Sequence, residues 1–171
     1  MTTETSIRFN RLPPLVAVQE FMSQGGQTTS VRNPKQALMY IGLMCEELGE
    51  GLTVLAEAAV ATSDKTTLER VAGELKRLSL SMRQGMHLGD MMRADQCELL
   101  DATLDTAWVA MGAALSMSTN AHGAWREVAR ANFDKYPGGQ ATRDAGGKIM
   151  KPADWRGPDL SPFVHDYSDH D

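Results

Sequence analysis

Residues 38–55, LMYIGLMCEELGEGLTVL, combine a helical pattern of apolar residues with three glutamates. The apolar residues recur at spacings of three and four, which is the periodicity of one helix face. They are Leu38, Ile41, Cys45, Leu48, Leu52 and Leu55. A second helical line, also apolar at both ends, carries Glu47 and Glu50, with Glu46 beside it. A helix that is apolar on two sides is expected to be enclosed by other helices, and the glutamates then stand where leucine would be expected.

Length and composition predict one all-α domain without a nucleic-acid or membrane partner. The chain has 171 residues and a formal net charge of -5, which argues against non-specific nucleic-acid binding. Methionines are many, aromatic residues are few, and runs of β-branched residues are scarce, which favours helices. No stretch approaches the roughly 20 apolar residues of a membrane span, and the first residues lack the apolar run of a signal peptide. Two cysteines indicate reduced thiols, so we expect a cytoplasmic protein, for which the cytoplasm of a bacterium or of a phage-infected host would fit.

The predicted organisation is a helical bundle of about five helices with an extended C-terminal tail. We expect a flexible arm over residues 1–14, a helical domain over 15–136 and a tail over 137–171. Asn33 followed by Pro34 is typical of a helix start, and Ser63 with Asp64 is expected to cap the next helix. The helices are expected at about 15–23, 34–61, 65–84, 91–117 and 120–136.

A second acidic patch lies on the helix expected at 91–117. Its main apolar stripe consists of Leu100, Leu104, Trp108, Met111 and Leu115. Glu98, Asp101 and Asp105 follow beside that stripe at offsets of three and four, so they share a helix face. If the two acidic patches face each other, four or more carboxylates meet in one pocket. Trp108 is expected in the core because of its place in the stripe.

Such a cluster of carboxylates requires neutralisation, because like charges at partial burial destabilise each other. Neither acidic helix offers many basic side chains near its patch, so hard divalent cations such as Mg²⁺ or Mn²⁺ are the expected solution. No histidine stands at the Glu-x-x-His spacing, which argues against a di-iron bundle. The alternative is that each patch is an ordinary solvated helix face, since EExxE alone is a weak signal.

The acidic motifs resemble those of a known superfamily. Residues 46–50, EELGE, followed by residues 98–101, ELLD, resemble the paired motifs of the all-α nucleoside triphosphate pyrophosphohydrolases. These include MazG proteins, dimeric dUTPases and phosphoribosyl-ATP pyrophosphohydrolase. Residues 128–135, VARANFDK, and 143–160, RDAGGKIMKPADWRGPDL, resemble the end of phage-type MazG-like proteins. The resemblance covers about residues 35–160, and it departs from short members in the 47 residues that separate Glu50 from Glu98.

The resemblance implies a Mg²⁺-dependent hydrolase that cuts a nucleoside triphosphate between its α and β phosphates. It assigns metal binding to Glu47, Glu50, Glu98 and Asp101, with Mn²⁺ as a substitute. It gives Glu46 either a further metal or the orientation of the attacking water. Glu46 and Glu47 are the candidate catalytic residues, because a nearby carboxylate must take the proton of that water. The role of Asp105 is left open. It could bind the metal, accept a hydrogen bond from a metal-binding group, or be an ordinary surface carboxylate.

The resemblance also implies that the C-terminal part contacts the substrate. The candidate substrate-binding residues are Asn132, Lys135, Arg143, Lys148 and Lys151. The alternative for each cation is a solvated side chain. Trp155 is open to either base stacking or packing.

Partners and substrate follow from amphipathicity and from the resemblance. A helix that is apolar on two sides needs more neighbours than five helices provide, so we expect a homodimer or homotetramer. Purine nucleotides such as dGTP or GTP are the first expectation for the substrate, in the control of nucleotide pools. The alternatives are a dUTP- or pyrimidine-directed pyrophosphatase and a non-enzymatic helical protein that binds a basic partner.

Overall fold

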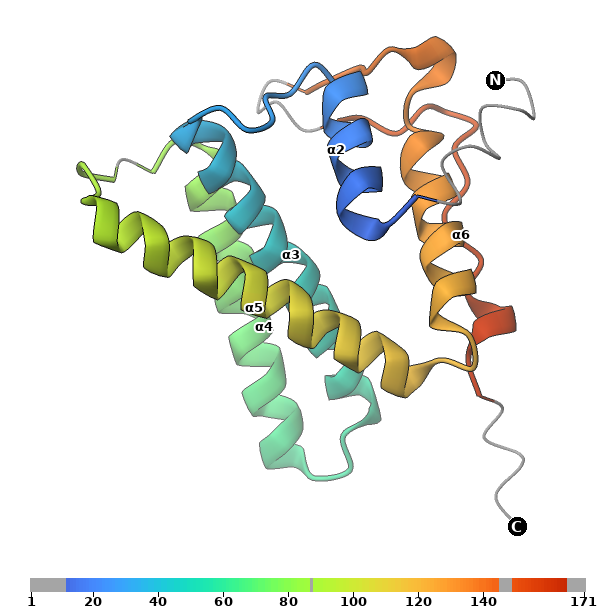
Figure 1. Cartoon of the computed structure of the whole chain (residues 1–171). Helices are drawn as coiled ribbons and strands as arrows, with labels where there is room; N and C mark the ends of the chain where they lie inside the picture. Colours follow the sequence, from blue (N-terminus) through green and yellow to red (C-terminus); the bar gives the residue numbers. More distant parts are fainter. Residues whose placement is uncertain (1–11, 87, 145–148, 166–171) are drawn as a thin grey trace. The chain divides into compact units, whose positions relative to one another are not determined.

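The computed structural model describes residues 12–86, 88–144 and 149–165, and this part of the chain is all-α. Its α-helices are α2 (Pro14–Gln24), α3 (Pro34–Ala58), α4 (Thr62–Arg83), α5 (Arg93–Met117) and α6 (Ala121–Phe133) (Figure 1). Two short 3₁₀ helices, η1 (Pro137–Gly139) and η2 (Ser161–Phe163), follow in the tail. The predicted all-α class with about five helices is confirmed for the described residues.

Side-chain caps begin two of the helices, at Asn33, which was predicted, and at Asn120. The Asn33 side chain accepts a hydrogen bond from the Gln36 amide at 3.1 Å, with Pro34 in the first turn. Asn120 caps α6 in the same way. The predicted cap at Ser63 is wrong, because α4 begins at Thr62 and its N-cap residue has no side-chain acceptor. Asp64 lies inside the first turn instead, where a carboxylate favours the positive end of the helix dipole.

The chain divides into two compact units, which we describe separately. One unit is Ser30–Gly89, which holds α3 and α4, and the other comprises the described residues of Met1–Thr29 and Asp90–Asp171. The predicted helical domain, residues 15–136, therefore contributes to both units. Most of the predicted arm, residues 1–11, lies outside the described residues.

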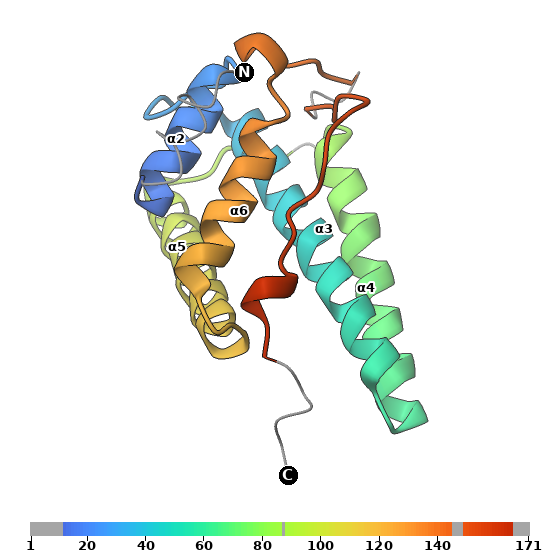
Figure 2. The same cartoon turned by 90° about the vertical axis from the view of Figure 1, so that its right-hand side faces the viewer.

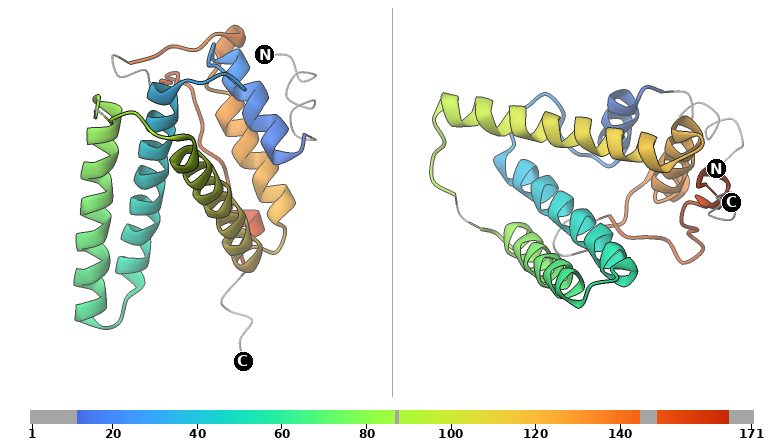
Figure 3. Two further views of the ribbon diagram at one scale, coloured as in Figure 1. Left: turned by 60° about the vertical axis from the view of Figure 1, so that its left-hand side comes forward. Right: turned by 90° about the horizontal axis from the view of Figure 1, so that it is seen from below.

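In the first unit, α3 and α4 run side by side along a seam of small residues (Figures 1 and 3). The buried residues of α3 are Gly42, Gly49 and Ala56, seven residues apart, and those of α4 are Ala72 and Ser79. A Cβ built on Gly49 would stand 3.1 Å from the Ala72 carbonyl oxygen. The two backbones approach closely because glycine has no side chain to separate them.

Two leucines of the predicted apolar stripe lie on an exposed side of α3, so the expectation that α3 is enclosed is wrong for that side of the helix. Leu48 is 57% exposed and Leu55 is 58% exposed. The reason is that glycine and alanine, not leucine, occupy the seven-residue repeat that faces α4. The other members of the predicted stripe are half-buried, and these are Leu38, Ile41, Cys45 and Leu52.

The core of the second unit joins α2 to the end of α6. Phe133 and Tyr136 are buried, and the Phe21 ring packs against both of them. The Tyr136 hydroxyl donates a hydrogen bond to the Phe21 carbonyl oxygen at 3.0 Å. A buried phenol requires such a partner, and this bond anchors α2 to the segment that follows α6.

The tail packs back along α6 (Figure 2). The last four carbonyl oxygens of a helix have no hydrogen-bond partner within the helix. In α6, each of these four oxygens accepts a hydrogen bond. Those of Arg130, Asn132 and Phe133 accept backbone amides, and that of Ala131 accepts the Trp155 indole N–H at 2.6 Å. Further along, the Thr119 amide donates to the Phe163 carbonyl at 2.9 Å. These bonds fix an irregular segment onto a helix.

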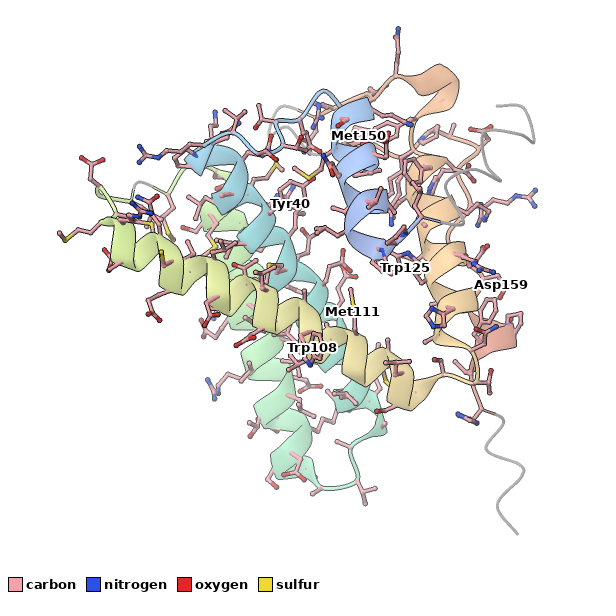
Figure 4. All side chains as sticks on the ribbon, viewed as in Figure 1. Tyr40, Trp108, Met111, Trp125, Met150 and Asp159 are labelled. Carbon is pink, nitrogen blue, oxygen red and sulfur yellow. The ribbon has the colours of Figure 1, made fainter. Side chains whose placement is uncertain are left out.

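Helix α5 has no buried residue. Leu100, Leu104 and Leu115 are 60%, 56% and 63% exposed. Trp108, which projects from α5 beside Met111 (Figure 4), is 78% exposed, so its expected place in the core is wrong. Among the described residues, none of the helices has the length and apolarity that crossing a membrane requires.

Candidate functional site

The first acidic motif borders a hollow on the α3–α4 pair. Glu46 and Glu50 stand four residues apart on α3, one turn of helix, and therefore point the same way. The hollow measures about 240 Å³, and its lining residues are Glu46, Glu50, Lys76, Ser79, Leu80 and Arg83. Glu47 is exposed and does not belong to this lining. The structure thus brings two of the three motif glutamates together at one surface.

Helix α4 supplies the positive charge that the sequence did not lead us to expect. The Arg83 guanidinium donates to the Glu46 carboxylate, with 2.7 Å between Nη1 and Oε2. Both side chains are largely buried, with 14% of Arg83 and 23% of Glu46 exposed. Basic neutralisation is therefore present for Glu46, and it comes from α4 and not from either acidic helix.

Two polar atoms at the hollow are buried without a hydrogen-bond partner among the described residues. They are Oγ of Ser79 and Nε of Arg83. The residue Ser79 as a whole is only 1% exposed. Buried donors without a partner are rare in native proteins. The sequence analysis did not identify Lys76, Ser79 or Arg83. The available signal was the seven-residue repeat of small residues, which turns Ser79 toward α3.

The second acidic motif lies in the other unit. Glu98, Asp101 and Asp105 are all exposed on α5. Within the described parts of the chain, no three acidic, histidine or cysteine side chains gather as a metal site would require. The chemistry of the donors still fits Mg²⁺, which prefers carboxylate oxygens. Of the predicted metal ligands, Glu50 lines the hollow, and Glu46 lines it with Glu50.

Three of the predicted substrate-binding residues gather around Trp155. Lys135 Nζ donates to the Asn132 side-chain oxygen at 2.7 Å. Lys135 and Lys151 both approach the Trp155 ring, with Nζ 5.6 Å and 4.3 Å from its centroid. These distances place both ammonium groups within cation–π range of one indole. The result is a cationic and aromatic surface where the tail meets the end of α6.

Arg143, another predicted substrate-binding residue, does not join this group. The Arg143 guanidinium donates to the Gly25 carbonyl at the end of α2. Arg143 also pairs with Ile149 in an isolated antiparallel bridge. Its side chain therefore has a structural contact. Lys148 lies outside the described residues.

An ion-pair network holds the tail beside this surface. Glu127 accepts two hydrogen bonds from Arg130, at 2.9 and 2.6 Å, and one from the Asp159 amide at 3.0 Å. Arg130 also reaches Asp134 at 2.6 Å and the Gly157 carbonyl at 3.2 Å. The hydrogen bonds from Arg130 lower the pKa of Glu127 below its ordinary value of 4.5, and burial opposes them in part. Figure 4 shows Asp159 beside α6.

No protein-family model matches this chain, and neither a curated protein nor a solved structure proved detectably similar to it.

Proposed function

We propose that this chain is a Mg²⁺-dependent nucleoside triphosphate pyrophosphohydrolase, which converts a (d)NTP and water to a (d)NMP and pyrophosphate. The observation that carries the proposal is the hollow where Glu46 and Glu50 meet the cations Lys76 and Arg83. Carboxylates suit a divalent cation, and basic groups suit a phosphate. The likeness of both acidic motifs and of the tail to MazG-like proteins supports the same activity, as an analogy.

The proposed roles follow the two acidic motifs. Glu47, Glu50, Glu98 and Asp101 are the proposed ligands of Mg²⁺, for which Mn²⁺ would substitute. When bound, Mg²⁺ would neutralise the polyphosphate and lower the pKa of a bound water. Glu46 and Glu47 are the proposed acceptors of the proton from the attacking water. The bond from Arg83 fixes the orientation of the Glu46 carboxylate at the hollow.

The surface around Trp155 is the proposed contact for the rest of the nucleotide. Lys135 and Lys151 would bind phosphate oxygens, and Asn132 would bind a sugar or phosphate oxygen. The indole offers a face on which a base can stack. The geometry favours these residues over Arg143, whose guanidinium is engaged by the Gly25 carbonyl.

Glu50→Gln tests the enzyme. The purified chain, incubated with Mg²⁺ and each of the eight common (d)NTPs and also with dUTP, is expected to release pyrophosphate from at least one, with dGTP and GTP first and dUTP as the alternative. Glu50→Gln removes a negative charge without changing shape, so it should reduce that release at least a hundredfold. Its circular dichroism spectrum should stay unchanged.

Glu57→Gln is the matched control, because Glu57 is an exposed glutamate of the same helix outside the motif. It should keep full activity. Wild-type protein that releases pyrophosphate from none of the nucleotides would contradict the proposal. The non-enzymatic alternative, in which acidic patches such as the exposed Glu98, Asp101 and Asp105 bind a basic partner, would then take its place.

A further inference from the structure

We propose that α4 provides the phosphate-binding side of the hollow, with Arg83 as its principal residue and Lys76 and Ser79 beside it. The ligand is the diphosphate part of the substrate, bound together with its divalent cation. This inference rests on the proposed function and deepens it. It gives a role to α4, the helix that lies between the two acidic motifs. In short members of the resembled superfamily, the segment between these motifs is shorter.

The first step in the argument is the set of unused hydrogen-bond donors. Arg83 commits Nη1 to Glu46, yet its Nε is buried without a partner among the described residues. The Ser79 hydroxyl, one helical turn before Arg83, is buried in the same condition and lines the same hollow. Donors in this position point to a ligand that brings acceptor oxygens.

The second step is the charge of the hollow, which selects the kind of acceptor. Glu46 and Glu50 would repel a bare anion, whereas Lys76 and Arg83 would repel a bare cation. A diphosphate that carries Mg²⁺ satisfies both sides, because its oxygens meet the cations and its metal meets the carboxylates. A guanidinium also suits phosphate geometry, since Nε and a terminal nitrogen can donate in parallel.

The third step concerns the ion pair itself. In the described structure Arg83 is held against Glu46, at 2.7 Å, on the side of α4 that faces α3. A phosphate that engages Arg83 would compete with Glu46 for the guanidinium. The carboxylate would then be released toward the metal or the attacking water. The alternative is that this ion pair only fastens α4 to α3.

Calorimetry with inorganic pyrophosphate and Mg²⁺ distinguishes these alternatives without any need for turnover. Arg83→Gln should weaken the binding of Mg²⁺–pyrophosphate about tenfold or more, because it removes charge-assisted hydrogen bonds to the phosphate. Ser79→Ala and Lys76→Gln should weaken it by smaller factors. Arg83→Lys, which keeps the charge but not the planar fork, should recover only part of the affinity.

Arg77→Gln is the matched control. Arg77 is also on α4 and also paired with a glutamate, Glu74, but that pair is exposed and outside the hollow. It should bind like wild type. A pair that only fastens helices would lower the melting temperature of Arg83→Gln and leave the affinity unchanged. Ser79→Ala keeps the test decisive if Arg83→Gln fails to fold.

The outcomes separate this inference from the proposed function. If wild type binds Mg²⁺–pyrophosphate and all α4 variants bind it equally well, the inference is wrong, while pyrophosphate release from a nucleotide would leave the enzyme standing. If wild type does not bind it, the inference also fails, and turnover decides the enzyme separately. If wild type binds pyrophosphate equally well with and without Mg²⁺, the proposal that the diphosphate binds together with its metal is wrong.

Discussion

Glu127 of α6 gives the attachment of the tail an expected dependence on pH, because it accepts a hydrogen bond from the Asp159 amide. Its pKa lies below the ordinary value of 4.5, chiefly because Arg130 donates hydrogen bonds to its charged form. A carboxyl group with a lowered folded-state pKa contributes its full stabilisation above the unfolded pKa. That contribution is lost as the pH falls through the lower, folded-state value. The contact with the Asp159 amide should therefore weaken only below about pH 4.5.

Hydrogen exchange of the Asp159 amide measures this effect. Its protection factor should stay constant above pH 4.5 and fall at lower pH, and in Glu127→Gln it should be low throughout. Glu74→Gln is the control, because Glu74 also has a lowered pKa, caused by Arg77, but holds no part of the tail. Unchanged protection in Glu127→Gln would show that Trp155 and η2 hold the tail without this carboxylate.

Single residues also show how far the candidate site could be predicted. The three glutamates were recognisable because charges interrupt an apolar pattern. Helical spacing placed Glu47 with Glu50, whereas the hollow is lined by Glu46 and Glu50. Arg83 was not recognisable, since 36 residues lie between it and Glu46. Their contact depends on the register of α3 against α4, which a local pattern does not encode. Likewise, Lys135 and Lys151 were selected for charge, but their shared ring, Trp155, appears only when the tail folds back.

At the scale of elements, the α3–α4 pair depends on the absence of side chains at its seam. A Cβ on Gly49 would press on the Ala72 carbonyl at 3.1 Å, whereas one on Gly51 would meet nothing within 4 Å. Gly49→Leu should therefore lower the free energy of unfolding by about 1–3 kcal/mol, the usual cost of overpacking. Gly51→Leu should not, because leucine is a good helix former at an open position. Urea titration followed by circular dichroism compares the two.

A loss of stability that is equal in both variants would contradict the close approach of the helices.

The same seam explains why the helices were predictable but their packing was not. Periodicity and the cap at Asn33 located α3 well, since both are local signals. The contact surface was misjudged because large apolar residues suggested it, whereas the seven-residue repeat of Gly42, Gly49 and Ala56 forms it.

At the scale of the molecule, α5 is a long helix with no buried residue. Its predicted apolar stripe exists as a helix face, yet Leu104 is 56% exposed and Trp108 is 78% exposed. A soluble monomer rarely exposes a contiguous apolar surface of this kind, and such surfaces usually mark an interface. The partner that the amphipathic pattern led us to expect, a second copy of the chain, remains our proposal for what covers it.

Trp108→Glu tests that proposal. A charge at a desolvated interface costs more than the same charge in water, so the variant should shift the molar mass measured by light scattering from a dimer or tetramer toward the monomer. Ala113→Glu is the control, because Ala113 is exposed on the same helix but points away from the stripe. A wild-type chain that is monomeric at all concentrations would exclude self-association through α5. If both variants dissociate the oligomer equally, the cause is a general effect of charge on this helix. An interface made by the stripe should be disrupted only when the glutamate stands on the face that carries the stripe.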